Sequence, residues 1–271
     1  MKKLIVSIIC ITLGLLIIPF VGCQKPDPNE LIIGASSIPH AQILRQAVQP
    51  MKDKGYTLKI QEISGYATMN DMLAHNDIDA NYFQHQQFLD DYLANNSGSK
   101  LSVLQKVHYE PMGIYKAQKD TLQLTSSDTI VIPNDTTNQQ RALELLVDAG
   151  IIVYNQEKQG DKYQIDSYNG LGDFDIKNID TATAETIPTL KPDVALMVVN
   201  GNNALNATNI DTQKDILHSE PPSLGEKYAN LVAIRTSDIE SPKMQALREI
   251  LSSQSIAEYI TNTYDGLVMP L

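Results

Sequence analysis

Cysteine is nearly absent from this chain of 271 residues, which contains only Cys10 and Cys23. Cys10 lies in an N-terminal segment that we expect to be cleaved off, so the mature chain would keep one cysteine and form no internal disulfide. A protein that folds in an oxidising compartment without disulfides depends on its hydrophobic core for stability. The roughly 250 residues that remain are enough for such a core, as one large domain or two smaller ones.

Positive charge is also scarce, because 21 Lys and Arg residues face 32 Asp and Glu residues and give a formal net charge of -11. Loss of Lys2 and Lys3 with the N-terminal segment would lower this charge by two, to -13. An acidic surface argues against binding to nucleic acid and against electrostatic attachment to anionic lipids. We therefore expect no nucleic acid among the partners of this protein.

The sequence also lacks the motifs of common hydrolases and metal sites. It contains no Gly-x-Ser-x-Gly motif, no phosphate-binding glycine-rich loop and no internal repeat. The five histidines are scattered, with no pair at the one-turn spacing of a helical zinc site. Asp77 and Asp79 are close together, but no glycine-containing calcium loop follows them. We therefore predict a binding protein with no metal, no cofactor and no catalytic residue.

One long apolar run, Leu4 to Val21, follows Lys2 and Lys3 and ends at Gly22-Cys23. A short basic head, an apolar stretch and a small residue before the cleavage site predict a signal peptide over residues 1–22. A cysteine directly after that small residue is similar to a bacterial lipoprotein signal, in which the cysteine carries the lipid after cleavage. A transmembrane anchor is the alternative, but it would not explain why a polar tether follows Gly-Cys at once.

Cys23 is therefore the expected lipidation site, and residues 23–30 form the expected lipidated tether. The stretch from Gln24 to Glu30 has two prolines and no apolar residue, which is typical of an extended linker. Two or more acyl chains, such as palmitate, hold a protein stably on a membrane. We expect a lipid anchor on the cell membrane, with the protein outside the cytoplasm, in a periplasm or on a cell surface.

From Leu31 onward, short β-rich runs alternate with amphipathic helical segments. The expected strands cover residues 31–35, 56–63, 78–83, 129–132 and 194–199, with expected helices between or after them. This alternation is typical of an α/β fold with a largely parallel sheet. Residues 211–227 would form a long loop, and residues 241–264 one broken helix or two consecutive helices.

Two α/β lobes are the simplest organisation of this pattern. We predict that residues 31–110 and 204–271 form the first lobe and that residues 111–203 form the second. The chain would cross between the lobes near Pro111 and again near Asn200. Each lobe would contain a mainly parallel sheet flanked by helices.

The most informative residues lie where expected strands meet the following helices. In open α/β sheets, ligands bind beyond the carboxyl ends of the strands. These junctions carry aromatic and amide side chains, in the segments Ser64 to Tyr66, Tyr82 to Gln86, Pro133 to Asn138 and Asn200 to Asn203. We therefore expect them to line a ligand-binding cleft.

The polar residues of these junctions suit a free amino acid. Arg141 lies about one helical turn beyond Asn138, so its guanidinium and the helix N-terminus would together bind a carboxylate. Asn200 and Asn202 would accept hydrogen bonds from an ammonium group.

The ring-bearing residues suit a ligand with an uncharged side chain, because Tyr66, Phe83 and His85 would line a pocket around that side chain. Each candidate also has a simpler explanation. Large aromatic residues are usually buried in a core, and a histidine at a helix start commonly bonds to the backbone. Arg141 on a helix is commonly a solvated charge, and asparagines are good helix caps. Only their clustering at consecutive strand ends favours a binding site.

Short motifs along the chain match a known family. They are Ile33 to Ala35 with Pro39 to Ala41, Ile78 to Gln86, Val107 to Tyr115, Ile132 to Asp135 with Asn138 and Arg141, Val198 to Asn202, and Tyr228 to Asn230. In this order and spacing the chain resembles the NlpA/MetQ family of methionine-binding lipoproteins, the substrate-binding subunits of methionine ABC importers. The resemblance covers nearly the whole mature chain. It implies a two-lobed periplasmic-binding-protein fold, type 2-like, with one ligand in the interlobe cleft.

The resemblance also implies a role for each matching residue. The aromatic and histidine residues would line a thioether pocket, the arginine would bind the ligand carboxylate, and the asparagines would hold the α-ammonium, with Asn230 coming from the other lobe. The implied ligand-binding residues are Tyr66, Phe83, His85, Arg141, Asn200, Asn202 and Asn230.

The chain departs from the family at two positions, with Asn203 where members commonly have an aromatic residue and Thr136 where they commonly have proline. L-methionine, D-methionine and a methionine-containing dipeptide all remain candidate ligands. The implied partners are the permease and ATPase subunits of an ABC transporter, and we expect a monomer. Two other functions remain open: a surface adhesin or scaffold that has lost its pocket, and an enzyme that acts on its ligand in the cleft.

Overall fold

The structure, a computed structural model, describes residues 27–158 and 164–271. The expected signal peptide (1–22), Cys23 and residues 24–26 of the tether lie outside the described residues. Among the helices of the described part, none is both long enough and apolar enough to cross a membrane.

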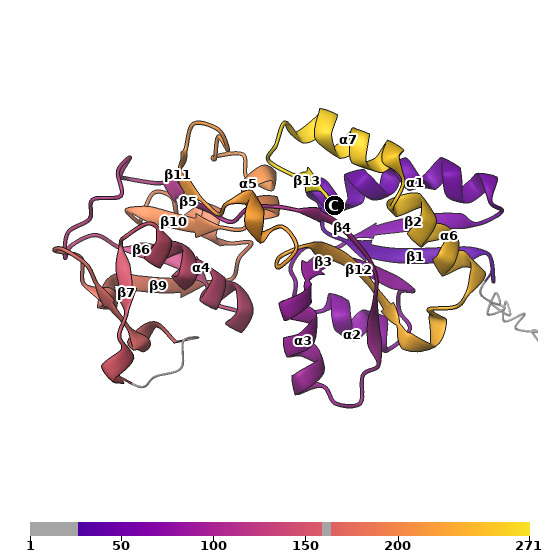
Figure 1. Ribbon diagram of the computed structural model, residues 1–271, viewed down its shortest axis with the longest axis horizontal. Helices are drawn as coiled ribbons and strands as arrows, with labels where there is room; N and C mark the ends of the chain where they lie inside the picture. Colours follow the sequence, from indigo (N-terminus) through magenta and orange to yellow (C-terminus); the bar gives the residue numbers. More distant parts are fainter. Residues whose placement is uncertain (1–26, 159–163) are drawn as a thin grey trace, which may run out of the picture.

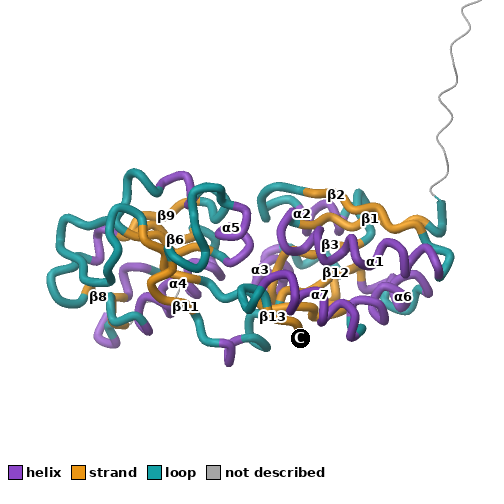
Figure 2. Tube along the Cα trace, turned by 90° about the horizontal axis from the view of Figure 1, so that it is seen from above, coloured by secondary structure: helices purple, strands orange, loops and turns teal. Residues whose placement is uncertain are grey.

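The described residues fold into two lobes that lie side by side along the long axis of the molecule (Figure 1, Figure 2). The helices are α1 (Gln42–Asp53), α2 (Met69–Ala74), α3 (Gln86–Asn95), α4 (Thr136–Asp148), α5 (Gly201–Asn206), α6 (Pro242–Leu251) and α7 (Gln254–Tyr264). The strands are β1 (Glu30–Ala35), β2 (Thr57–Glu62), β3 (Ala80–His85), β4 (Leu101–Tyr109), β5 (Gly113–Lys116), β6 (Ile130–Pro133), β7 (Ile152–Tyr154), β8 (Tyr168–Gly170), β9 (Ile179–Ala182), β10 (Leu196–Val199), β11 (Ile216–Ser219), β12 (Asn230–Arg235) and β13 (Met269–Pro270). The two-lobed α/β arrangement confirms the predicted fold class.

The first lobe is built on a six-stranded sheet in the order β13-β4-β12-β3-β1-β2. Helices α1, α6 and α7 cover one face of this sheet, and α2 and α3 cover the other (Figure 1). Helix α1 buries Ile43, Leu44, Ala47 and Met51, whose spacing places them on one helical face. Val48, which follows Ala47 directly, is exposed and lies outside this buried face.

The second lobe is built on a five-stranded sheet in the order β11-β5-β10-β6-β9, with a small β7-β8 hairpin beside it. Helix α4 packs on one face through Ala142, Leu143 and Leu146, which meet Ile130 and Ile132 of β6. The other face carries a smaller apolar cluster. Each lobe thus has its own core.

Both sheets are mixed rather than mainly parallel, so this detail of the prediction is wrong. Strand β1 pairs in parallel with β2 and β3, and β6 pairs in parallel with β9 and β10. Strand β12 is antiparallel to both β3 and β4, and strand β5 is antiparallel to both β10 and β11. The antiparallel pairs therefore involve the strands that flank the two interlobe crossings.

The second crossing lies later in the chain than predicted. The first crossing joins β4 to β5, but β11 still pairs with β5 in the sheet of the second lobe. The chain therefore returns to the first lobe between Ser219 and Asn230, and residues 204–219 do not belong to the first lobe as predicted. The expected loop over residues 211–227 contains this strand. The sequence pattern does not predict β11, because this strand is short and only partly buried.

Two buried strands carry polar residues to the space between the lobes. All six residues of β3 are buried, and the strand ends with Phe83, Gln84 and His85. All four residues of β10 are buried, and Asn200 follows directly. Burial on both faces fixes such strands firmly, so the side chains at their ends are held in place.

Asp215 provides a test of the packing of the second lobe. It is 7% exposed, and Lys191 and Lys116 lie 2.6 and 3.0 Å from its carboxylate oxygens. Burial alone would raise the pKa of Asp215, but the bonds from both lysines outweigh it and lower the pKa to about 2. We expect Asp215→Asn to lower the free energy of unfolding by about 2 kcal/mol at neutral pH, measured by urea unfolding.

The expected pH dependence follows from the sign of this shift. A lowered pKa means that the stabilisation is present above the unfolded pKa of 3.8 and disappears as the pH falls toward about 2. The difference between wild type and variant should therefore shrink over that interval. Asp173→Asn, at an exposed position, is the control. A difference that stayed constant with pH would contradict the proposed ion pairs.

Candidate ligand-binding site

A small chamber lies between the lobes and is lined by residues of both. Its free volume is about 20 Å³, enough for about one water molecule. Its lining residues are Tyr66, Phe83, Gln84, His85, Phe88, Glu110, Asn138, Arg141, Asn200, Gly201, Asn202 and Asn230. All seven residues predicted to bind the ligand are therefore brought together around one space. Their individual roles stay predictions.

The apolar side of the chamber is an aromatic cluster. The ring centroids of Tyr66 and Phe83 are 5.7 Å apart, and Phe88 packs edge-on against both at 6.0 and 5.5 Å. These distances are typical of favourable aromatic pairs. Phe83 is only 4% exposed, so it is a buried core residue and also part of the chamber wall. The cluster offers a surface on which an apolar side chain or a thioether would pack.

His85 is held at the start of α3. Its Nδ1 accepts a hydrogen bond from the backbone N–H of Phe88 at 3.4 Å, so it is the N-cap of that helix. Its Nε2 lies 3.3 Å from Oδ1 of Asn138 in the other lobe. Burial and the nearby charge of Arg141 lower the pKa of His85 to about 3. The ring is therefore neutral and donates to Asn138 through Nε2.

The N-terminus of α4 is already capped by Asp135. The Asp135 carboxylate accepts from the backbone N–H of Asn138 at 3.0 Å and from its side-chain amide at 3.0 and 3.1 Å. An acidic N-cap at this helix end disfavours a ligand carboxylate there, and the expected carboxylate site stays a prediction. Thr136 is the first residue of the helix, a position that also suits proline.

Asn138 joins three parts of the chamber. Its Oδ1 accepts from Nδ2 of Asn200 at 2.8 Å as well as facing His85. The amide oxygen of Asn200, Oδ1, is buried and has no hydrogen-bond partner among the described residues. A buried acceptor without a partner is unfavourable. Asn200 therefore presents an unused acceptor in a chamber wall.

Arg141 is buried at 3% exposure rather than solvated. Its Nε and Nη2 donate to the two carboxylate oxygens of Glu220 at 2.6 and 2.5 Å, and Nη2 also donates to the backbone oxygen of Glu110 at 2.9 Å. The ring of Tyr228 lies 4.2 Å from the guanidinium carbon. Burial opposes the charge of Arg141, but the ion pair with Glu220 outweighs it and the pKa is raised.

This ion pair changes how a ligand carboxylate would meet Arg141. The charge of the guanidinium is already balanced by Glu220, which also accepts from the hydroxyl of Tyr109 and the N–H of Met112. A carboxylate would therefore have to approach the remaining amino group, Nη1, or displace Glu220. No local pattern predicts this pair, because the partners are 79 positions apart along the chain.

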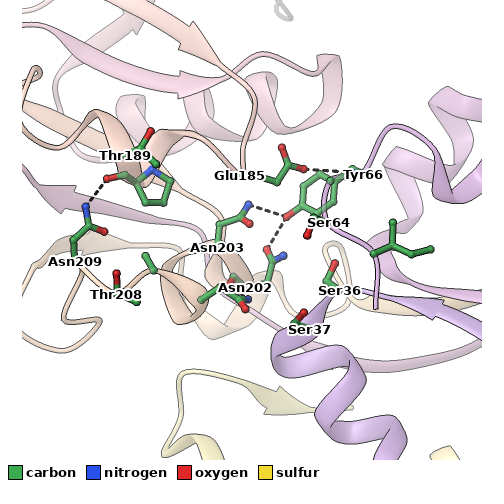
Figure 3. A pocket seen from close by; sticks show the side chains of 15 residues that line it. Ser36, Ser37, Ser64, Tyr66, Glu185, Thr189, Asn202, Asn203, Thr208 and Asn209 are labelled. Carbon is green, nitrogen blue, oxygen red and sulfur yellow. Dashed lines mark hydrogen bonds between the residues drawn. The ribbon is translucent and has the colours of Figure 1, made fainter. Parts of the chain in front are cut away.

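An open cleft of about 450 Å³ adjoins the chamber and shares Tyr66 and Asn202 with it. Figure 3 shows Tyr66 of the first lobe between polar side chains of the second. Its hydroxyl donates to Oδ1 of Asn202 at 2.7 Å and accepts from Nδ2 of Asn203 at 3.0 Å. Its backbone N–H donates to Glu185 at 3.0 Å. Tyr66 therefore closes the chamber on the side of the cleft.

Asn203 thus has a defined place in this chain. The amide of Asn203 donates a hydrogen bond to Tyr66 and so joins the two lobes. Asn202 is also engaged, since its Oδ1 accepts from Tyr66. Of the two asparagines expected to accept from an ammonium group, only Asn200 keeps its side-chain oxygen unpaired.

A model of the NlpA lipoprotein family matches residues 31–271. The chain belongs to the NlpA lipoprotein family. The methionine-binding lipoprotein MetQ of Bacillus subtilis is 32% identical, over 96% of this chain and 97% of its own length. This confirms the predicted family.

Solved structures of similar proteins share the fold of this NlpA family member. A nutrient-binding protein from Burkholderia cenocepacia, bound to methionine, is 28% identical with a TM-score of 0.78, over 89% of this chain and 99% of that one. A periplasmic substrate-binding protein of an ABC transporter from Coxiella burnetii is 27% identical with a TM-score of 0.78, over 89% of this chain and 100% of that one. The two-lobed fold is therefore that of substrate-binding proteins.

Sequence reasoning missed several chamber residues. Phe88 was not singled out, although it lies three residues after His85 at a helix start, where it returns to the same side. Asn138 and Gly201 stand out in the sequence only as members of the strand-end segments and family motifs. Glu110 belongs to a family motif, but nothing in its neighbours along the chain signals a buried carboxylate.

The ion pair of Arg141 and Glu220 predicts a large effect on stability. We expect Glu220→Gln to lower the free energy of unfolding by about 3–5 kcal/mol, because it leaves a buried guanidinium without its counter-ion. Urea unfolding followed by circular dichroism would measure this. The double variant Arg141→Gln with Glu220→Gln removes both charges and should be more stable than the single variant. A double variant that is less stable than Glu220→Gln would contradict this account of the pair.

Proposed function

We propose that this protein is a lipid-anchored, extracytoplasmic substrate-binding protein of an ABC importer, and that it binds methionine or a close derivative in the interlobe chamber. The lipid on Cys23 would keep it beside the membrane. The permease and ATPase subunits of the transporter would receive the ligand. The protein would act as a monomer and would release its ligand chemically unchanged.

The single observation that carries the proposal is the convergence of complementary groups from both lobes on one closed chamber. The aromatic cluster of Tyr66, Phe83 and Phe88 offers an apolar surface, Arg141 offers a guanidinium, and Asn200 offers a buried acceptor. A methionine zwitterion has a matching group for each of these. The name of the Bacillus relative and the methionine bound to the Burkholderia protein support the same ligand.

The lobes would have to separate for a ligand to enter. The chamber of about 20 Å³ is far smaller than the 300–1,000 Å³ of typical ligand pockets. Interlobe bonds surround it, including those of Tyr66 and the bond from Nδ2 of Asn206 to the backbone oxygen of Ile38 at 2.8 Å. We infer that ligand binding shifts a population between open and closed forms, and that the contacts described here belong to a closed form.

The first experiment identifies the ligand. Small molecules released when the purified protein is denatured should include L-methionine, D-methionine or a methionine-containing dipeptide, detected by mass spectrometry. Calorimetry with each compound, on protein refolded to remove bound ligand, would then rank them. Absence of any released ligand, together with no binding of the three compounds, would favour the surface adhesin or scaffold instead. Recovery of a chemically altered ligand after long incubation would favour an enzyme.

Asn200 gives the sharper test of the chamber. We expect Asn200→Leu to weaken methionine binding by about 1.5–3 kcal/mol in calorimetry, because it removes an acceptor for the ligand's charged group. Asn95→Ala is the matched control, since that exposed amide lies at the end of α3 and bonds only to its own helix turn. Wild-type affinity in the Asn200 variant would rule out this residue as a ligand contact.

A further inference from the structure

Glu110 is a buried carboxylate in the wall of the chamber. It lies in the first crossing, between β4 and β5, and is only 3% exposed. Burying a carboxylate is strongly unfavourable unless a cation or several hydrogen bonds compensate for the lost hydration. The neighbours of Glu110 therefore decide whether its charge is already balanced within the protein.

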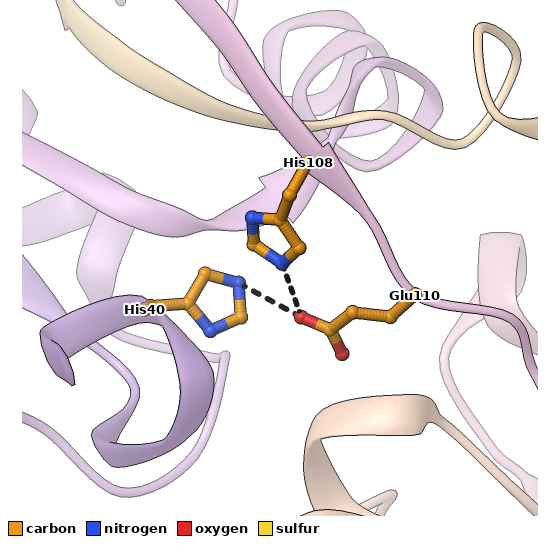
Figure 4. Close-up of side chains that lie close together, drawn as sticks. All are labelled: His40, His108 and Glu110. Carbon is orange, nitrogen blue, oxygen red and sulfur yellow. Dashed lines mark hydrogen bonds and ion pairs between the residues drawn. The ribbon is translucent and has the colours of Figure 1, made fainter. Parts of the chain in front are cut away.

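Two histidines converge on the same oxygen of Glu110, as Figure 4 shows. Nε2 of His108 lies 2.6 Å from Oε1, and Nε2 of His40 lies 3.4 Å from the same atom. Nε2 of His40 also faces Oδ1 of Asn230 at 2.9 Å. Both rings are fully buried. Their polar contacts hold the carboxylate in one orientation.

The hydrogen bonds indicate that both histidines are neutral donors. The hydroxyl of Tyr82 is bonded to Nδ1 of His108, so the proton of that ring sits on Nε2 and points at Glu110. In His40, Nδ1 has no partner among the described residues, whereas Nε2 faces two acceptors. Burial lowers the pKa of His108 to about 3 and that of His40 to about 4. Neither ring brings a positive charge to Glu110.

Among the described residues, Arg141 is the only Lys or Arg that lines the chamber, and Glu220 already balances its charge. It forms two bonds to the Glu220 carboxylate and donates to the backbone oxygen, not the carboxylate, of Glu110. The single guanidinium therefore lies beside two carboxylates, those of Glu220 and Glu110, and forms its ion pair with Glu220. Burial raises the pKa of Glu110, whereas the charge of His40, in the protonated form of that ring, and the charge of Arg141 lower it. The net rise is expected for an acid whose counter-ion is missing.

The start of α5 brings the unused acceptor of Asn200 to the same part of the chamber. Gly201, the next residue, is so close to Glu110 that an added Cβ would lie 2.7 Å from the Glu110 Cβ and 3.1 Å from Oε2. Only glycine permits this approach. The backbone N–H of Asn202 also helps to hold the carboxylate. A carboxylate without a cation and an acceptor without a donor therefore lie against the same short segment.

We propose that Glu110 is the counter-ion of a primary ammonium group on the ligand, with Asn200 as a second acceptor, and that this pair makes the site selective for ligands with a free amine. An ammonium group has three N–H donors and one positive charge, which matches both unmet requirements. His40 and His108 then act as positioning residues for the carboxylate. This inference rests on the proposed binding function and specifies the ligand class that the chamber accepts.

A metal ion is the competing explanation of the same cluster, because His40, His108 and Glu110 place one ligand atom each within 4.8 Å of one another. Metal binding needs unprotonated ring nitrogens. With the tautomers assigned above, both Nε2 atoms carry protons that point at oxygen acceptors. The geometry favours a carboxylate that is held by two donors and awaits a cation from the ligand.

The test compares L-methionine with its desamino analogue, in which hydrogen replaces the amino group. Calorimetry would use the full chain purified in detergent and stripped of ligand. We expect wild type to bind methionine about 30-fold or more tightly than the analogue. Glu110→Gln should weaken methionine by a similar factor but change the affinity for the analogue by less than about threefold, because the analogue never uses the charge. Glu226→Gln removes a surface carboxylate of 79% exposure and should leave the ratio unchanged.

Several outcomes would overturn the inference. Equal affinity of wild type for methionine and the analogue would do so without any variant. Equal weakening of both ligands by Glu110→Gln would assign this residue to structure alone. A stoichiometric metal ion in the purified protein, lost in the Glu110 variant, would establish the competing explanation.

A measurement without methionine separates this inference from the proposed function. If Glu110 lacks a counter-ion in the empty protein, Glu110→Gln should unfold at the same or a higher urea concentration than ligand-free wild type. A lower midpoint would mean that the protein itself already balances the charge, which would overturn the inference even if methionine binds. Failure of wild type to bind methionine, with an unchanged or raised midpoint, would reject the proposed ligand and leave the ammonium site standing.

Discussion

The buried guanidinium of Arg141 is the interaction on which the arrangement of the two lobes depends. Glu110 lies in the first crossing between the lobes and Glu220 directly after β11, at the start of the second. Arg141 on α4 bonds to the backbone of the former and the carboxylate of the latter. One side chain therefore fastens both crossing segments to the second lobe. Because the pair is buried at 3% exposure on each side, solvent does not weaken it.

Much of this structure could be predicted from the sequence, because periodic patterns report burial directly. The runs that became β1, β3, β6 and β10 were apolar enough to read as strands, and polar residues after them marked the edge where a ligand would bind. The convergence of Phe83, Arg141 and Asn200 on one chamber follows from that rule together with the family motifs. The residues next to Phe83, Arg141 and Asn200 along the chain were therefore enough to predict that these three side chains line one site.

The remainder could not be predicted, because it depends on contacts between distant parts of the chain. Glu220 sits in a stretch that reads as a loop, and only the folded arrangement brings it to Arg141. His40 and His108 are scattered along the sequence, yet both face Glu110. The same limit explains the misplaced boundary after Asn203, since β11 is short and gains its partner only from β5. Pairing of isolated polar residues leaves no periodic signal.

The carboxylate and the ammonium group of a zwitterionic ligand would be recognised by different interactions in this chamber. A ligand carboxylate would meet an arginine whose charge Glu220 already balances, so hydrogen-bond geometry would matter more there than net charge. An ammonium group would meet Glu110, whose charge no cation among the described chamber residues balances, so it would gain a new ion pair in a site without bulk water. Glu110 also lies in a crossing segment that must adjust when the lobes separate. Under the proposed assignment, the ammonium group of the ligand therefore stabilises the first interlobe crossing. Because the position of this crossing differs between the open and closed forms, ligand binding is coupled to closure of the lobes.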